Sequence, residues 1–127
     1  MNAAHDCYEN AHARFCIVHG ILYFEYKPDT VISLTVARKV VSDRIQFQNE
    51  MIYPVLCDIR GIKDSNKAGR DYLAQFGSVL TKAVAILGNP QVSETMSDFY
   101  LKVNKPTIPT SFFTNEEHAL AFLKTYL

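Results

Sequence analysis

The 127-residue sequence lacks the features that mark several large classes of protein. Acidic and basic residues balance at thirteen each, so no basic excess is present to bind nucleic acid or an anionic membrane. No apolar run approaches the roughly 18 residues of a spanning helix, and the first residues are polar and mixed rather than a secretion leader. We therefore expect a cytoplasmic protein with no transmembrane segment and no nucleic-acid partner.

Cysteines are few and show no recognisable framework. Cys7, Cys16 and Cys57 are odd in number and have no C-x-x-C spacing, so they predict neither a disulfide framework nor a zinc knuckle. Cys16 and Cys57 fall in strand patterns, where a thiol behaves as a small buried hydrophobe. We expect Cys7 to be an exposed thiol and Cys57 to be inert.

The sequence also lacks a signature of catalysis. No paired carboxylates, Ser/His/Asp set, phosphate loop or metal cluster can be assembled from it. His5, His12 and His19 are evenly spaced, but residues seven apart share a face only on a helix, and the last two bracket a strand pattern. We expect no enzymatic activity, no cofactor and no metal site.

The chain does contain a buried strand that leads through a charged loop into a helix. Residues 53–59 form a short apolar run, typical of a strand buried on both faces. The segment 60–65 is charged, and a helical pattern begins near Asn66. Because open α/β sheets bind ligands and partners outside the carboxyl ends of their strands, we place the candidate site at this junction.

Strand and helix patterns alternate along the rest of the chain. Further strands are predicted at 12–18, 21–26, 83–87 and 110–113, and further helices at 33–48, at 92–103 and after a capping box that starts at Thr114. His19-Gly20 predicts a hairpin turn, and Ser33 is a suitable helix N-cap. The order β-β-α-β-α-β-α-β-α predicts a single α/β domain over residues 12–127, with a mixed, mostly parallel sheet covered by helices. Residues 1–11 show no period, so we expect a loosely ordered start.

Several short stretches resemble a group of small bacterial STAS-like proteins of unknown function. They are Ala13-Arg14-Phe15, Gly20-Ile21-Leu22, Glu25-Tyr26-Lys27-Pro28, Tyr53-Pro54-Val55-Leu56, Asp58-Ile59-Arg60-Gly61, Arg70-Asp71-Tyr72-Leu73, Asn104-Lys105-Pro106 and Phe113-Thr114. The STAS fold is that of bacterial anti-sigma-factor antagonists, and lipid-carrying CRAL-TRIO domains loosely resemble it. The resemblance runs from about His12 to the end and implies a STAS-like α/β fold.

The resemblance also implies a regulatory position. In partner-switching antagonists, a serine at the start of the helix after the third strand is phosphorylated and controls docking. Ser65 is the nearest match by position, and its alternative interpretation is an ordinary helix N-cap. Asp58 ends the strand, and Arg60-Gly61 stands where the antagonists have serine and glycine. Cations around this helix start either bind an anion or form a solvated face paired with acids; they are Arg60, Lys63, Lys67 and Arg70.

Together these patterns favour a non-enzymatic binding or regulatory module. The leading hypothesis is a protein–protein interaction through residues 58–70, with another protein or a second copy of the chain as partner. The alternative is a carrier or sensor of a small apolar ligand or lipid, which the lipid-carrying relatives of the fold favour. Its pocket would be lined by aromatic residues, although these usually fill the core. The candidates are Tyr23, Tyr26, Phe99, Tyr100 and Phe112.

Overall fold

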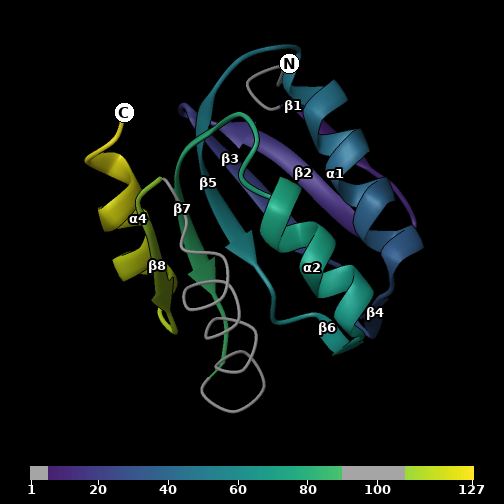
Figure 1. The fold of residues 1–127 in the computed structure, drawn as a ribbon. Helices are drawn as coiled ribbons and strands as arrows, with labels where there is room; N and C mark the ends of the chain where they lie inside the picture. Colours follow the sequence, from purple (N-terminus) through teal and green to yellow (C-terminus); the bar gives the residue numbers. More distant parts are fainter. Residues whose placement is uncertain (1–5, 90–107) are drawn as a thin grey trace.

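The computed structural model describes residues 6–89 and 108–127, and Figure 1 shows how its elements are arranged. The strands are β1 (Asp6–Glu9), β2 (Ala13–Val18), β3 (Ile21–Tyr26), β4 (Thr30–Ile32), β5 (Tyr53–Asp58), β6 (Ile62–Ser65), β7 (Thr81–Leu87) and β8 (Thr110–Phe113). The helices are α1 (Leu34–Gln48), α2 (Lys67–Phe76) and α4 (Glu116–Lys124). The helix predicted at 92–103 lies outside the described residues.

Six strands form the main sheet in the order β1-β2-β3-β5-β7-β8. The pairs β1–β2 and β2–β3 are antiparallel, and the remaining three pairs are parallel. The sheet is therefore mixed and mostly parallel, as the sequence predicted. Helices α1 and α2 lie on one face, which we call the first face, and α4 lies on the second face (Figure 1). Strands β4 and β6, which were not predicted, pair in parallel as a separate two-stranded sheet.

Local signals explain where several elements begin and end. His19 and Gly20 both have positive φ, 51° and 83°, so the predicted hairpin turn is confirmed. The Ser33 side chain accepts a hydrogen bond from the Val36 amide, which confirms the cap of α1. The prediction for the last helix was wrong by one residue, because Asn115 rather than Thr114 caps it and accepts from the His118 amide.

The first face carries a core rich in large side chains. Phe15 is fully buried, and its ring stacks on Phe24 with centroids 4.9 Å apart. Tyr26 lies edge-on to Phe24 at the same distance, and Val40 of α1 is fully buried above them. Aromatic side chains bury much apolar area each, so this face holds the larger share of the core.

The second face is packed with small side chains. Ala83 and Ala85 of β7 and Ala119 of α4 are fully buried, and Leu123 is the large side chain among them. With so little bulk between them, α4 lies directly on β7 and reaches β5 and β8. It leaves the half of this face formed by β1, β2 and β3 without a helix among the described residues (Figure 1).

The expectation of a loosely ordered start is wrong for residues 6–9, which form β1 on the edge of the sheet. Long-range contacts that the local sequence does not reveal hold this strand. The Tyr8 ring stacks on Phe15 with centroids 5.8 Å apart, and the Asn10 amide donates to the Asp43 carboxylate at 2.9 Å. Residues 1–5 lie outside the described residues.

The predictions for two of the cysteines were also wrong. Cys7 and Cys16 form a disulfide, so Cys7 is not a thiol and Cys16 is not simply a buried hydrophobe. They face each other in the register of β1 and β2, with Cα atoms 4.2 Å apart. Only the pairing of the two strands brings them together, and β1 was not predicted.

Within the described residues, no helix is long and apolar enough to cross a bilayer.

Candidate functional site

The loop after β5 is organised by one carboxylate. Asp58 is 9% exposed, and it accepts a hydrogen bond from the Arg60 backbone amide at 3.0 Å. It also accepts from Nε and Nη2 of the Arg60 guanidinium at 2.9 and 2.7 Å. This two-pronged bond fixes the orientation of the guanidinium and raises the pKa of Arg60. The side chain nevertheless stays half exposed, so the loop presents a fixed positive group to solvent.

A glycine lets the same loop pass close to β3. A Cβ atom on Gly61 would lie 2.3 Å from the Tyr26 carbonyl oxygen and 2.6 Å from that of Lys27. No side chain fits in that space without moving backbone. The Ile59 amide donates to the Leu87 carbonyl at 2.9 Å, which ties the loop to β7 as well. The segment 58–61 is therefore fixed at the carboxyl ends of three neighbouring strands, β3, β5 and β7.

Arg60 borders a hollow on the open half of the second face. This hollow, which we call the polar depression, has a volume of about 330 Å³. Besides the disulfide, its main lining residues are Arg14, Tyr23, Glu25, Asp58, Arg60 and Glu116. Burial and the nearby Glu116 raise the pKa of Tyr23, so its hydroxyl keeps its proton. The depression thus offers donors and carboxylates side by side around one fixed guanidinium.

The predicted cations do not all meet at this place. Arg60 and Lys63 both line a second hollow of about 430 Å³ next to the polar depression. Lys67 lies on α2 and pairs with Asp71 at 2.7 Å, one turn further along the helix. Such an exposed pair is typical of a solvated helix surface. The candidate site is therefore centred on Asp58 and Arg60, with Lys63 at its edge.

Ser65 is not the helix cap. It ends β6, and Asn66 caps α2 by accepting from the Gly69 amide at 2.8 Å. The Ser65 hydroxyl instead accepts a hydrogen bond from Nη1 of Arg70 at 3.0 Å, and its carbonyl accepts from the same nitrogen. Arg70 is thus engaged with Ser65. The phosphorylation of Ser65 stays a prediction.

The predicted aromatic pocket is not formed as a group. Tyr23 and Tyr26 lie three positions apart on β3 and face opposite sides of the sheet, because side chains alternate along a strand. Phe112 packs against the core of the first face. Phe99 and Tyr100 lie outside the described residues. Of the candidates within the described residues, Tyr26 alone borders the cavity described next.

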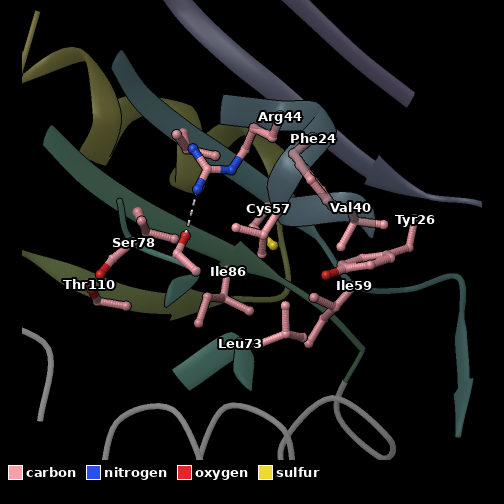
Figure 2. A pocket seen from close by; sticks show the side chains of 14 residues that line it. Phe24, Tyr26, Val40, Arg44, Cys57, Ile59, Leu73, Ser78, Ile86 and Thr110 are labelled. Carbon is pink, nitrogen blue, oxygen red and sulfur yellow. Dashed lines mark hydrogen bonds between the residues drawn. The ribbon is translucent and has the colours of Figure 1, made fainter. Parts of the chain in front are cut away.

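A small cavity lies between the first face and helices α1 and α2 (Figure 2). Its volume is about 70 Å³, and most of its surface is apolar. The lining residues whose side chains carry polar atoms are Tyr26, Arg44, Cys57, Ser78 and Thr110. Burial raises the pKa of Tyr26 well above its usual value and that of Cys57 to about 12, so both stay protonated. Sequence reasoning missed this cavity, because its walls come from six separate elements, β3, α1, β5, α2, β7 and β8.

Arg44 is the residue of this cavity that the sequence analysis overlooked. It is only 3% exposed; Nη1 donates to the Gln48 side chain, and Nη2 donates to the Gly77 carbonyl at 3.2 Å (Figure 2). The sequence does place Arg44 on the same helix face as Val40 and Gln48, since it follows the first by one helical turn and precedes the second by another.

Among the described residues, no group of three or more His, Cys, Asp or Glu side chains is placed to hold a metal ion.

Comparison with known proteins assigns this chain to a family. A family model described as a domain of unknown function (DUF7793) matches residues 15–127. The chain belongs to the DUF7793 family. No curated protein matches it.

The fold of this DUF7793 protein is similar to that of a solved structure. That structure is an uncharacterised protein of the DUF3478 family with a SpoIIAA-like fold, from Shewanella loihica PV-4. The match has a TM-score of 0.59 and 15% sequence identity, and it covers 94% of this chain and 92% of the other. The DUF7793 protein therefore has a SpoIIAA-like, or STAS-like, fold, as the sequence resemblance implied.

Proposed function

We propose that this DUF7793 protein is a non-enzymatic binding module whose protein partner docks on the polar depression. One observation carries the proposal: Asp58 holds the Arg60 guanidinium by two side-chain hydrogen bonds while half of that side chain stays exposed. A group fixed in advance loses little conformational freedom on binding. Arginine and tyrosine also dominate the energetics of many protein interfaces, and Tyr23 lies in the same depression.

The charges around Arg60 indicate the chemistry of the partner. Glu25 and Glu116 are exposed and belong to different elements, and both lie close enough to influence the pKa of Arg60. The half-buried Tyr23 and the disulfide supply a less polar surface between them. We therefore expect a protein surface with a basic side chain for the two glutamates and an acceptor for Arg60. Complementary charges of this kind set specificity and association rate.

Affinity capture from cells that naturally contain the protein tests the proposal. Partners recovered by wild type are identified by mass spectrometry and then quantified for Arg60→Gln, Lys63→Gln and the control Lys67→Gln. We expect the Arg60 change to weaken capture of a specific partner about tenfold or more, and the Lys63 change to weaken it less. The melting temperature should stay unchanged, because Arg60 is half exposed.

The outcome that contradicts the proposal is a partner recovered equally by wild type and Arg60→Gln. Lys67→Gln is a suitable control because Lys67 is also a charged residue of the same region, yet it lies on α2 in a pair with Asp71. If the partner is a second copy of the chain, sedimentation velocity should show a dimer whose dissociation constant rises in Arg60→Gln and not in Lys67→Gln.

The alternative, a carrier of an apolar ligand, has one specific observation in its favour, the cavity of the first face. Its described walls enclose about 70 Å³, whereas ligand pockets commonly reach about 300–1,000 Å³. These walls favour a small ligand over a lipid. Native mass spectrometry of protein purified without denaturation tests the lipid version. A bound species of several hundred daltons that is lost on denaturation would support it, and a bare chain or bare dimer would count against it.

A further inference from the structure

The Cys7–Cys16 disulfide forms part of the wall of the polar depression. Cys7 is exposed and Cys16 is half-buried. Disulfides buried in a core resist reduction by glutathione, whereas exposed ones are more easily reduced and include many of the regulatory and catalytic examples. The position of this disulfide therefore indicates a bond that small thiols from solvent can reach.

The disulfide is one of several links that hold β1 on the sheet. All four residues of β1 pair in register with β2. On the first face, the Tyr8 ring stacks on Phe15, and the Asn10 side chain donates to Asp43 just after the strand ends. These links remain when the bond between the two sulfur atoms breaks, so both cysteines stay opposite each other and can close the bond again. The structure thus favours reversible opening of the disulfide over release of the strand.

The third cysteine of the chain is kept apart from this disulfide. Cys57 lies on β5 and packs against the core of the first face, whereas the disulfide lines a hollow on the second face. Burial also raises the pKa of Cys57 to about 12, and the thiolate is the form that attacks a disulfide. Exchange within the chain is therefore blocked, and opening requires an external thiol.

The charges of the depression favour this exchange and indicate the thiol that suits it. Arg14 lies two residues before Cys16 on the same face of β2 and lines the same hollow. A nearby cation stabilises a cysteine thiolate and makes it a better leaving group. Glu25 and Glu116 bring the opposite charge to the wall. A thiol that carries both an ammonium and a carboxylate group therefore matches the charges around the disulfide.

We propose that the Cys7–Cys16 disulfide is a thiol–disulfide exchange site for small polar thiols that carry charges of both signs. The thiolate of such a molecule attacks Sγ of the exposed Cys7 and forms a mixed disulfide, while the electron pair of the broken bond leaves on Sγ of Cys16. A second thiolate attacks the sulfur of the first thiol, and Cys7 leaves as a thiolate. Two thiols are thereby oxidised to one disulfide, and their two electrons and two protons reduce the protein disulfide to two thiols. The exchange needs no docked partner, so it goes beyond the proposed function.

Equilibration in mixtures of reduced and oxidised glutathione tests the proposal on the full chain. Free thiols are trapped with N-ethylmaleimide in denaturant and counted by intact-mass spectrometry. A closed chain takes one maleimide, on Cys57, and an open chain takes three. We expect the open fraction to rise from almost none to almost all as reduced glutathione replaces the oxidised form, and to fall again when the ratio is reversed. The circular dichroism spectrum should stay native throughout.

Variants test the order of attack and the role of the cation. Cys16→Ser leaves the exposed Cys7 without its partner, and Cys7→Ser leaves the half-buried Cys16. We expect oxidised glutathione to form a mixed disulfide several-fold faster with Cys7 than with Cys16, because Cys7 is the more accessible sulfur. Arg14→Gln should slow the opening of the disulfide several-fold, whereas Lys67→Gln, which removes a cation from α2, should not.

A disulfide that stays closed in every glutathione mixture, or that opens only when the native circular dichroism spectrum is lost, would overturn the proposal, because the bond would then be purely structural. Equal reaction rates of Cys7 and Cys16, or equal opening rates in Arg14→Gln and Lys67→Gln, would overturn the assigned mechanism. None of these results depends on the capture experiment with Arg60→Gln, so the two proposals stand or fall separately.

Discussion

The two faces of the sheet are packed by different means, and the difference bears on where ligands can bind. On the first face, large rings such as Phe15 and Phe24 share a core with α1, and a cavity remains between the sheet and helices α1 and α2. On the second face, Ala83, Ala85 and Ala119 let α4 lie directly on the strands. The first face therefore contains an internal cavity, and the second has a surface depression beside α4.

The largest expected effect comes from a substitution at the centre of the core on the first face. Phe15→Ala removes a fully buried ring that stacks on Phe24 and Tyr8, and it should lower the free energy of unfolding by about 3–5 kcal/mol. Urea denaturation followed by circular dichroism measures the change. Phe76→Ala serves as a control, because that ring is 37% exposed and its loss should matter much less. Similar losses in the two variants would contradict the described core.

The next effect concerns the open half of the second face, where the disulfide lies. It closes a loop between positions nine apart, so reducing it should lower the free energy of unfolding by about 2–3 kcal/mol. Urea denaturation with and without dithiothreitol measures this, and Cys7→Ser should reproduce the reduced value and no longer respond to the reductant. If wild type does not respond either, Cys7 and Cys16 are not joined in the protein.

A pair of enlarging substitutions compares the two faces directly. Ala85→Leu adds bulk where α4 is closely packed and should cost about 1–3 kcal/mol of unfolding free energy. Val41→Ile adds a methyl group beside the cavity and should cost less than about 1 kcal/mol because there is space for it. Thermal and urea denaturation of both variants give the comparison. Equal costs would mean that the two faces are equally well filled.

The smallest effect at neutral pH involves the Cys57 thiol. Burial raises its pKa from 9.0 to about 12. Between these values the unfolded thiol has lost its proton while the native one keeps it, so stability contributed by this group falls as pH rises from about 9 to about 12. Iodoacetamide at pH 8 should modify Cys57 only after unfolding, as followed by intact-mass spectrometry. Rapid modification of native protein would contradict the raised pKa of this thiol.

The architecture was predictable because its signals are local. The hairpin at His19-Gly20, the cap at Ser33 and the apolar run of β5 each lie within a few residues, and the structure confirms them. Strands β1, β4 and β6 were missed because each has only three or four residues and is defined by pairing. The disulfide was missed for the same reason, since it depends on the pairing of β1 with β2.

The residues of the candidate site differ in how far the sequence located them, and their role in binding stays a prediction. Asp58 and Arg60 lie together, as expected from a recognisable buried strand that ends at Asp58. Lys67 was grouped with them by proximity in the sequence, yet it points away on α2, where Asp71 pairs with it. Tyr23 and Tyr26 were grouped by residue type, yet the alternation of β3 separates them. Nothing in the sequence near Tyr26 indicates that six elements line a cavity beside it.

The tight crossing at Gly61 has a consequence for the history of the family. A Cβ atom there would overlap the carbonyl oxygens of Tyr26 and Lys27, so any descendant with another residue at this position must route the loop away from β3. The position of Arg60 depends on that route. We therefore expect a relative without glycine at this position to place its loop, and any arginine in it, differently.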